Sequence, residues 1–167
     1  MADHSLLLIT DTNIWIDLNH GMLLDIVFRL PYQICASDFA RQEIRSVDVT
    51  ELEKQGLIFL ELEPSSVLEL YELRQAKRVI AVADFAAYLL ARQRSGILIT
   101  GDRNLASFSE SKNITVHGLL WLLDEMIHYE LLGFTEAAHA LDKILKMGAR
   151  LPKLECEKRI RLWAGNL

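Results

Sequence analysis

Short runs of consecutive apolar residues alternate along this chain with longer helical patterns, and this alternation restricts the possible folds more than any other feature. Four runs are strong and a fifth is weaker, at residues 6–10, 33–36, 57–62, 97–100 and 114–117. Strands that are covered on both faces have such consecutive apolar residues. Helices are predicted at residues 13–30, 38–47, 65–78, 81–94 and 119–132. Alternating strands and helices form parallel sheets, so we predict a three-layer α/β/α domain with a mostly parallel sheet of about five strands.

The end of the chain continues with two more helical patterns, at residues 135–147 and 153–163. Gly133 and Gly148 separate these stretches, and Pro152 is suited to the start of the last helix. A length of 167 residues, 51% of them hydrophobic, is typical of one domain with a sizeable core. We therefore predict a main domain over residues 1–132 and a helical extension, residues 133–167, packed on it.

The net charge of -5 is unevenly distributed. Residues 143–161 contain seven basic and two acidic side chains, so the rest of the chain is more acidic than the net value indicates. An acidic body repels phosphates, which argues against a nucleic-acid partner unless metal ions or a local basic patch intervene. For the basic tail we favour contact with a partner or with solvent.

The sequence also predicts a soluble cytoplasmic protein. Cys35 and Cys156 are the only cysteines and lie far apart, so a disulfide framework is not expected. The N-terminus lacks the basic and apolar regions of a secretory signal. No apolar stretch approaches the roughly 18 residues that a membrane span needs, so we expect no membrane association.

Acidic residues follow two of the predicted strands at their carboxyl ends. Asp11 comes directly after the run LLLIT, and Asp102 follows ILIT after one glycine. Ligands of open parallel sheets bind at this edge, so both acids stand where chemistry usually occurs. Each could instead cap the helix that follows, and Asn13 could cap in place of Asp11. Two acids in equivalent positions favour a functional role.

Asp84 is the only charged residue in the apolar helical segment VIAVADFAAYLLA, residues 79–91. A buried carboxylate costs free energy unless a cation or hydrogen bonds compensate for it. Arg78 or Arg92 could be a purely structural partner, but a metal ion is the simpler explanation if Asp84 faces the two strand-end acids. Glu43 lies on a helix predicted to follow the second strand. We include it as a candidate only because the other three acids are candidates.

A cluster of carboxylates needs positive charge, and Mg²⁺ and Mn²⁺ are ions that prefer oxygen ligands. Such ions bind phosphate oxygens and assist phosphodiester cleavage, which would make an acidic protein compatible with a polyanionic substrate. Competing chemistries lack their motifs, because the sequence has no G-x-x-x-x-G-K-[ST], no G-x-G-x-x-G, no G-x-S-x-G and no H-x-x-x-H pair.

Four segments of the chain resemble PIN-domain nucleases, particularly the VapC-type ribonuclease toxins of prokaryotic toxin-antitoxin pairs. They are LLLITDTNIWIDL with Asp11, ASDFARQEI with Glu43, VADFAAYLLARQ with Asp84 and ILITGDRNLASF with Asp102. Each motif is loose by itself, but the four in this order are jointly fairly specific. The tail from Gly133 onward resembles the helical ending of one PIN-like subgroup.

The resemblance implies a metal-dependent endoribonuclease that hydrolyses RNA phosphodiester bonds. Its four catalytic carboxylates would be Asp11, Glu43, Asp84 and Asp102. Three of them, Asp11, Asp84 and Asp102, would hold one or two Mg²⁺ or Mn²⁺ ions. Many family members carry a further Asp at the position of Asn104, so the uncharged amide in this chain implies weaker binding of a second metal.

The resemblance further implies polar supports beside the acids, namely Thr10, Asn13, Thr100 and Asn104. Three arginines close in sequence to the acids could contact RNA phosphates: Arg41, Arg45 and Arg103. Surface ion pairs with Asp or Glu are at least an equal explanation for these arginines.

Two other functions and the choice of partners stay open. An aspartate-nucleophile phosphatase would use Asp11, but Asn13 stands where the second Asp of D-x-D is expected. A PIN-like protein-interaction module without activity is supported by Asn104 and opposed by the presence of all four acids. The VapC-type resemblance implies an RNA substrate, a small antitoxin and a homodimer. The leucine-rich residues 119–132 could supply an interface, although such patterns more often form core.

Overall fold

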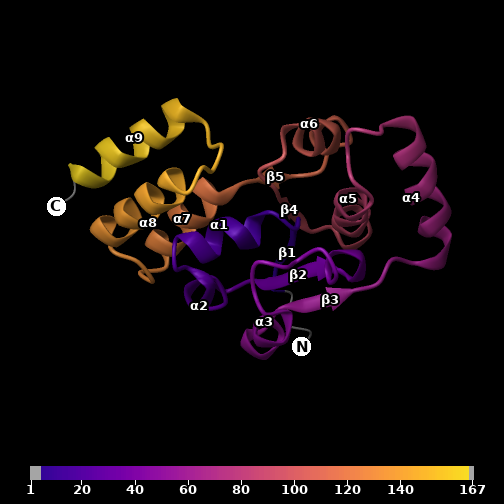
Figure 1. Ribbon diagram of the computed structural model, residues 1–167, viewed down its shortest axis with the longest axis horizontal. Helices are drawn as coiled ribbons and strands as arrows, with labels where there is room; N and C mark the ends of the chain where they lie inside the picture. The colour runs from indigo at the N-terminus through magenta and orange to yellow at the C-terminus, as the bar shows by residue number, and fades with distance from the viewer. Residues whose placement is uncertain (1–4, 166–167) are drawn as a thin grey trace.

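A parallel sheet lies at the centre of the computed structural model, which describes residues 5–165 (Figure 1). Within those residues the sheet has five strands: β1 (Leu7–Thr10), β2 (Gln33–Ser37), β3 (Ile58–Leu60), β4 (Ile97–Ile99) and β5 (Val116–His117). Their order is β3-β2-β1-β4-β5, and every neighbouring pair is parallel. The predicted α/β class and the number of strands are confirmed.

Helices connect these strands and cover the sheet. Within residues 5–165 they are α1 (Ile14–His20), α2 (Leu24–Val27), the 3-10 helix η1 (Asp38–Ala40), α3 (Val49–Gln55), α4 (Pro64–Ala76), α5 (Val82–Arg94), α6 (Arg103–Ser111), α7 (Leu119–His128), α8 (Phe134–Lys146) and α9 (Lys153–Ala164). None of these helices is long and apolar enough to cross a membrane. The chain runs outward from β1 to β3 and then continues on the other side of β1, so the strand order reverses between β1 and β4. Ligands of such sheets bind at the carboxyl ends beside this reversal.

Separate hydrophobic clusters cover the two faces of the sheet. Leu8 and Ile9 are neighbours in β1 and both are fully buried. Leu8 belongs to the cluster that contains Trp15 of α1, whereas Ile9 belongs to the cluster that contains Phe85 of α5. Successive side chains of a strand point to opposite faces, which explains why the strand sequences are apolar on consecutive residues. Full burial of a side chain of this size stabilises the fold by about 1.5–3 kcal/mol.

The helix predicted at residues 13–30 is two helices in the structure. α1 ends at His20, and Met22 then adopts a left-handed conformation with a φ of 57°. At Gly21 a Cβ atom would stand 2.7 Å from Cδ1 of Ile144 in α8. The chain therefore turns at a glycine whose missing side chain allows α8 to pack closely against the end of α1.

The helix predicted at residues 38–47 is wrong. Oγ of Ser37 accepts a hydrogen bond from the backbone N–H of Ala40 (3.2 Å), but it starts only the short η1, after which the chain turns. The next helix, α3, begins after Asp48, whose carboxylate accepts a hydrogen bond from the backbone N–H of Thr50 (2.9 Å). Neither α3 nor α6 was predicted, and both begin after an Asp whose side chain caps the helix.

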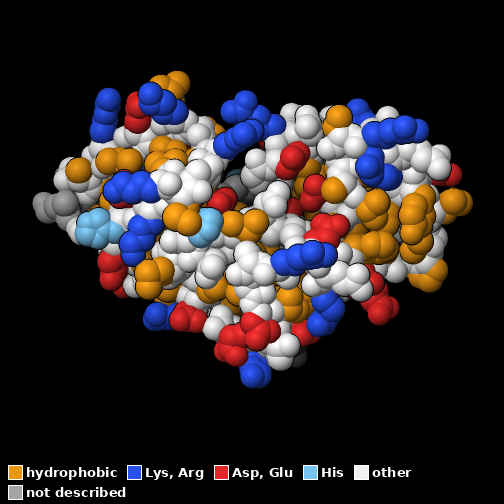
Figure 2. All heavy atoms as spheres, in the orientation of Figure 1, with side chains coloured by type: hydrophobic (Ala, Val, Ile, Leu, Met, Phe, Trp, Pro, Cys, Tyr) orange, Lys and Arg blue, Asp and Glu red, His pale blue; other side chains and the backbone are white. Residues whose placement is uncertain are grey.

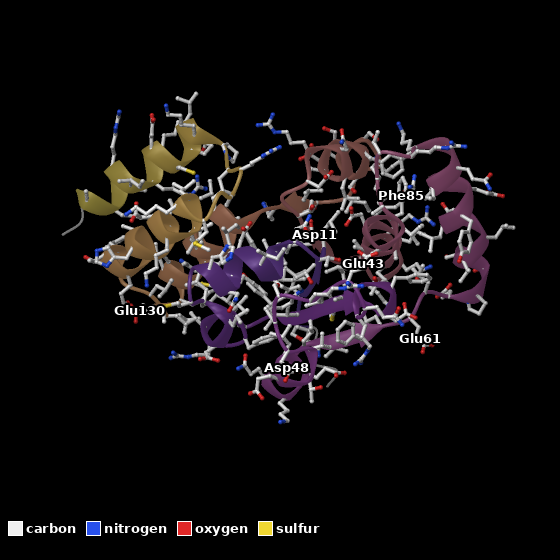
Figure 3. All side chains as sticks on the ribbon, viewed as in Figure 1. Asp11, Glu43, Asp48, Glu61, Phe85 and Glu130 are labelled. Atoms are coloured by element: carbon white, nitrogen blue, oxygen red, sulfur yellow. The ribbon has the colours of Figure 1, made fainter. Side chains whose placement is uncertain are left out.

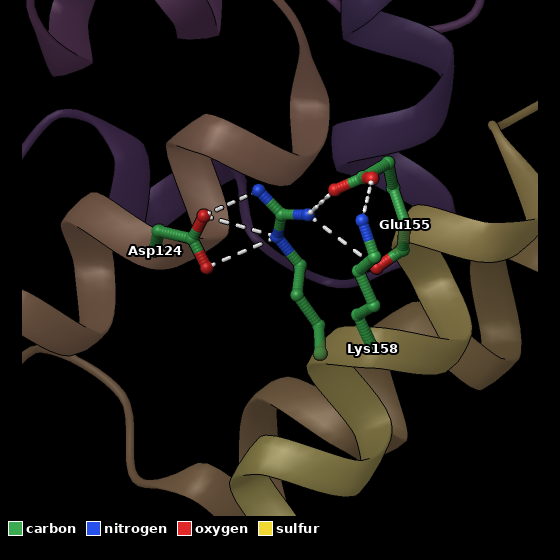
Figure 4. A network of polar contacts seen from close by, with 4 residues as sticks. Asp124, Glu155 and Lys158 are labelled. Carbon is green, nitrogen blue, oxygen red and sulfur yellow. Dashed lines mark hydrogen bonds and ion pairs between the residues drawn. The ribbon is translucent and has the colours of Figure 1, made fainter.

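The C-terminal helices share a hydrophobic cluster with α1 and α7. The buried side chains of α8 recur along one face of the helix: Ala137, Ala140, Leu141 and Ile144. α9 contributes the buried Cys156 and Trp163 to the same cluster. Arg159 of α9 also pairs with Asp124 of α7 and with Glu155 one turn earlier (Figure 4). One core therefore extends from the sheet into α8 and α9.

The leucine-rich helix α7 belongs to this core. Leu119, Leu122, Leu123 and Met126 expose at most 2% of their surface. These residues therefore pack inside the molecule and are not available as an interface. The two cysteines, which are also buried, are free thiols as the sequence predicted.

Candidate metal centre

Asp11 stands just after the carboxyl end of β1 and exposes 2% of its surface. Its Oδ1 accepts a hydrogen bond from the backbone N–H of Ile14 (3.0 Å), and its Oδ2 accepts one from Oγ1 of Thr100 (2.5 Å). Burial raises the pKa of this carboxyl to about 6, although the hydrogen bonds from Thr100 and Ile14 lower it. The fold thus holds Asp11 in one orientation and disfavours its charge.

Thr100 joins Asp11 to Asp102 across the ends of β1 and β4. Its Oγ1 donates to Asp11 and accepts a hydrogen bond from the backbone N–H of Asp102 (3.0 Å). Asp102 caps α6, because its Oδ1 accepts a hydrogen bond from the backbone N–H of Leu105 (2.8 Å). Asn13 precedes α1 but makes no capping bond with its side chain. Asp102 is therefore the cap of α6, Asp11 binds the first backbone N–H of α1, and both also belong to one cluster, so the two interpretations of the sequence are compatible.

Asp84 lies in the first turn of α5 and faces the other acids. Burial is the largest cause that raises the pKa of its carboxyl to about 7. Repulsion by three neighbouring acids raises it further, in the order Asp11, Asp102 and Glu43. Arg92 does not compensate this charge, because it binds Glu69 through two hydrogen bonds (2.6 and 2.7 Å). In the described part of the chain no Lys or Arg pairs with Asp84.

Glu43 lies in the turn after η1, and its side chain is exposed. Oγ1 of Thr12 donates a hydrogen bond to its Oε2 (3.5 Å), which links this turn to the segment after β1. Figure 3 shows Asp11 and Glu43 near the middle of the molecule, whereas other labelled acids lie towards its edges: Asp48, Glu61 and Glu130. Figure 2 shows several Asp and Glu side chains in the same central area. The fold brings together the four acids that the sequence singled out.

The chemistry of this donor set fits Mg²⁺ or Mn²⁺. All four side chains supply carboxylate oxygens, which these hard cations prefer. A bound cation would offset the burial and repulsion that raise the pKa values of Asp11 and Asp84. Within residues 5–165 the side chains do not already form a group of three or more His, Cys, Asp or Glu ligands for a metal ion.

Three threonines surround the acids and hold different partners. Thr100 bonds to two of the acids, as described above. Thr10 is buried, but its Oγ1 donates to the backbone oxygen of Cys35 (3.2 Å) and so fastens β1 to β2. Thr12, which bonds to Glu43, is a site residue that the sequence did not indicate. Its place between Asp11 and the following Asn is the signal that could have found it.

The two asparagines predicted near the acids border different cavities. Asn13 is exposed and lines a cavity next to the carboxyl ends of β4 and β5. Asn104 is exposed on α6 and lines another cavity together with Lys77 and Phe108. Neither side chain makes a hydrogen bond to another residue in the range 5–165.

The three arginines near the acids also differ. Arg41 forms an ion pair with Glu53 through two hydrogen bonds (2.5 and 2.9 Å), as the surface-pair interpretation expects. Arg45 donates only to a backbone oxygen of its own turn (3.5 Å). Arg103 is exposed at the start of α6 and makes no ion pair with any residue that the structure describes. Its guanidinium is therefore free to meet a phosphate.

The acids gather at the carboxyl edge of a five-stranded parallel sheet, where ligands of such folds bind. Residues 7–164 match the family described as DUF3368: PIN domain, and the chain belongs to this PIN-domain family. Among solved structures the chain is similar to a PilT N-terminus domain protein from the hyperthermophilic archaeon Sulfolobus solfataricus P2. That similarity has a TM-score of 0.47 and 11% sequence identity, and it covers 71% of this chain and 92% of that chain. No curated protein matches the chain.

Proposed function

We propose that this chain is a metal-dependent endoribonuclease that hydrolyses RNA phosphodiester bonds. One observation carries the proposal: four carboxylates from four separate segments converge at the strand ends, where burial and then repulsion by the other three acids raise the pKa of Asp84. A protein keeps such a cluster, which costs free energy, when a cation or a reaction uses it. Membership of the PIN-domain family supports a nuclease over a phosphatase.

The residues of the cluster have distinct tasks in this proposal. Asp11, Asp84 and Asp102 would hold Mg²⁺ or Mn²⁺, and Thr100 keeps Asp11 in position through its hydroxyl. The ion, when bound, supplies positive charge and Lewis acidity at a phosphate. Glu43 is the exposed member and is free to orient the attacking water and to accept its proton.

The proposal also accounts for the charge of the chain. An acidic protein repels RNA in the absence of other ions. Divalent cations at the cluster would reverse the local charge at the place where a phosphate must approach. The free guanidinium of Arg103 lies beside the same strand ends and adds a second positive group.

Cleavage of a mixed RNA pool by wild type and Asp84→Asn tests the proposal. With Mg²⁺ or Mn²⁺ the wild type should cleave RNA and lose this activity in chelator, and Asp84→Asn should be slower by on the order of 10³-fold. Asp142→Asn is the matched control, because Asp142 is exposed and pairs with Lys146 on α8. Circular dichroism shows whether each variant is folded. Equal cleavage by a folded Asp84→Asn would overturn the proposal.

We also propose that the chain is the toxin of a toxin-antitoxin pair and forms a homodimer. The four motifs that resemble VapC-type toxins support this role. An exposed apolar surface supports the existence of an interface: Leu68 and Tyr71 of α4 expose 67% and 52% of their surface. Figure 2 shows hydrophobic side chains gathered over α4. A dimer in light scattering and a small protein that co-purifies would support these roles, whereas a monomer without a partner would contradict them.

A catalytically inactive interaction module is the competing function. It is supported by Asn104, which stands where many family members carry an Asp. Asn104 also lines a cavity that the other expected supports, Thr10, Asn13 and Thr100, do not line. Calorimetric titration with Mn²⁺ separates the two functions. Metal affinity without cleavage of any RNA would favour the interaction module.

A further inference from the structure

A cavity of about 360 Å³ adjoins the acid cluster on the side of α7 and the α8–α9 connection. It shares Asn13, Thr100 and Gly101 with the surroundings of the acids. Thr100 is the residue whose hydroxyl holds Asp11, so this cavity begins one side chain away from the proposed metal ligands. The cavity is therefore close enough to the acids for one RNA strand to contact both.

Two aromatic rings line this cavity. The rings of His117 and Trp121 are stacked with their centroids 4.4 Å apart and an angle of 7° between them. Tyr32, which directly precedes β2, stacks on Trp121 in turn, with ring centroids 5.9 Å apart, and so supports the pair. Burial lowers the pKa of His117, which favours the uncharged ring at neutral pH. Unpaired bases stack on aromatic side chains, and because Trp121 already stacks on two rings, His117 is the ring that would receive the base.

The charged residues of the cavity are three arginines and three acids, the acids being Asp17, Glu110 and Glu155. Arg103 and Arg150 line it, and neither forms an ion pair or hydrogen bond with another residue from 5 to 165. Arg159 also lines it but is occupied by Asp124. Figure 2 shows Lys and Arg side chains above, and Asp and Glu side chains below, the space between α9 and α6.

One half-buried carboxylate of the cavity accepts no hydrogen bond from the described residues. It belongs to Asp17 of α1. Burial raises its pKa, so the side chain gains from a donor that replaces lost water. The amino and ring N–H groups of a base are donors of this kind.

We propose that this cavity is a subsite for one unpaired nucleobase of the RNA strand, held against the His117–Trp121 pair, with flanking phosphates on Arg103 and Arg150. This inference rests on the proposed function, because the same strand must reach the acid cluster. It adds a cause of sequence preference, since a base in a cavity of this size is distinguished by its shape and by its donors to Asp17.

Binding of short single-stranded RNAs to Asp84→Asn protein in Mg²⁺ tests the subsite without cleavage. Fluorescence anisotropy compares an intact RNA with a set in which each position in turn lacks its base. One abasic position should weaken binding about 5- to 100-fold, while the others change it little. In addition, Arg150→Ala should lower the slope of log affinity against log salt by about 0.7, and Arg29→Ala, an exposed control, should not.

His117→Ala should remove the effect of the abasic position, and His117→Phe should retain it because the ring is kept. His128→Ala is the matched control, since His128 lies on α7 but does not line this cavity. Equal losses at every abasic position, or an unchanged pattern in His117→Ala, would overturn the subsite.

The proposed function is judged separately, by cleavage with wild-type protein. Cleavage without a base-dependent position overturns the subsite alone. A base-dependent position without any cleavage overturns the nuclease proposal and leaves an RNA-binding cavity.

Discussion

Two groups of charged side chains in this molecule are built in opposite ways. Arg159 donates to Asp124 at 2.7 to 3.1 Å and to Glu155 at 3.2 Å, which joins α9 to α7 (Figure 4). Asp11 and Asp84 face other acids, and no Lys or Arg among residues 5–165 pairs with them. The first group stabilises the protein without any ligand, whereas the second costs free energy until a cation binds. The difference separates charges that serve the fold from charges that serve a ligand.

The largest expected effect is that of a divalent ion on the acid cluster. At about 100 times its dissociation constant, Mg²⁺ or Mn²⁺ should raise the free energy of unfolding by about 2.7 kcal/mol. For a domain of this size each kcal/mol raises the melting temperature by about 2–4 °C. Thermal unfolding with ion and with chelator measures the rise, which Asp84→Asn should largely remove. An equal rise in both proteins would show that the ion binds elsewhere.

The second effect concerns the ion pairs of Arg159 with Asp124 and Glu155. Arg159→Ala should lower the free energy of unfolding by about 2 kcal/mol, because Asp124 and Glu155 lose a guanidinium that exposes only 20% of its side chain. Urea unfolding measures the change. Arg161→Ala, on an exposed part of the same helix, should stay within about 0.5 kcal/mol of wild type. If the two variants lose the same amount, the network does not hold α9 in place.

The third effect is the pH dependence of stability that Asp11 and Asp84 cause. The pKa values of Asp11 and Asp84 are about 6 and about 7 in the folded protein, against 3.8 ordinarily. The folded protein therefore binds these protons more tightly than the unfolded chain does. The stability they contribute is fully present below about pH 4 and is lost as the pH rises through about 7.

Solvent screening of the half-buried Asp84 limits this effect to on the order of 1–2 kcal/mol. In chelator, the free energy of unfolding of wild type should fall by this amount, relative to Asp84→Asn, between about pH 5 and about pH 8. Urea unfolding at the two pH values measures the difference. Parallel curves for the two proteins would mean that Asp84 does not carry a raised pKa.

The smallest effect is expected for an exposed ion pair. Asp142 and Lys146 are 2.6 Å apart on α8, with side chains 55% and 73% exposed. A double-mutant cycle with Asp142→Asn and Lys146→Gln should give a coupling energy of about 0.3–0.5 kcal/mol. A coupling energy as large as the loss in Arg159→Ala would show that an exposed ion pair stabilises this protein as much as a partly buried one.

The sequence predicted the strands well and the connections after β1 and β2 poorly. The central strands were identified because two covered faces require apolar residues at every position. The break at Gly21 was not, because it depends on the approach of Ile144 from a distant helix. The turn that carries Glu43 was mistaken for a helix, since a cap at Ser37 starts either a long or a short helix and only the following packing decides which.

The site divides in the same way. Asp11 and Asp102 could be selected from their places after strands, and Asp84 from its apolar surroundings. Thr100 was expected beside the acids, but its hydrogen bonds to Asp11 and Asp102 were not, because they depend on the pairing of β1 with β4. The pairing of Arg41 with Glu53 was equally hidden, although ion pairing of such arginines was an expected outcome.

The sequence by itself therefore determined the layered parallel fold and the set of acids, because apolar runs and the residues that follow them are local properties of the chain. Only the tertiary structure decided that these acids meet, that no cation of the described chain neutralises them, and that a cavity with two stacked rings opens beside them. The physical reason is that electrostatic repulsion and burial depend on distances in space. Those distances are set by the order of the strands in the sheet.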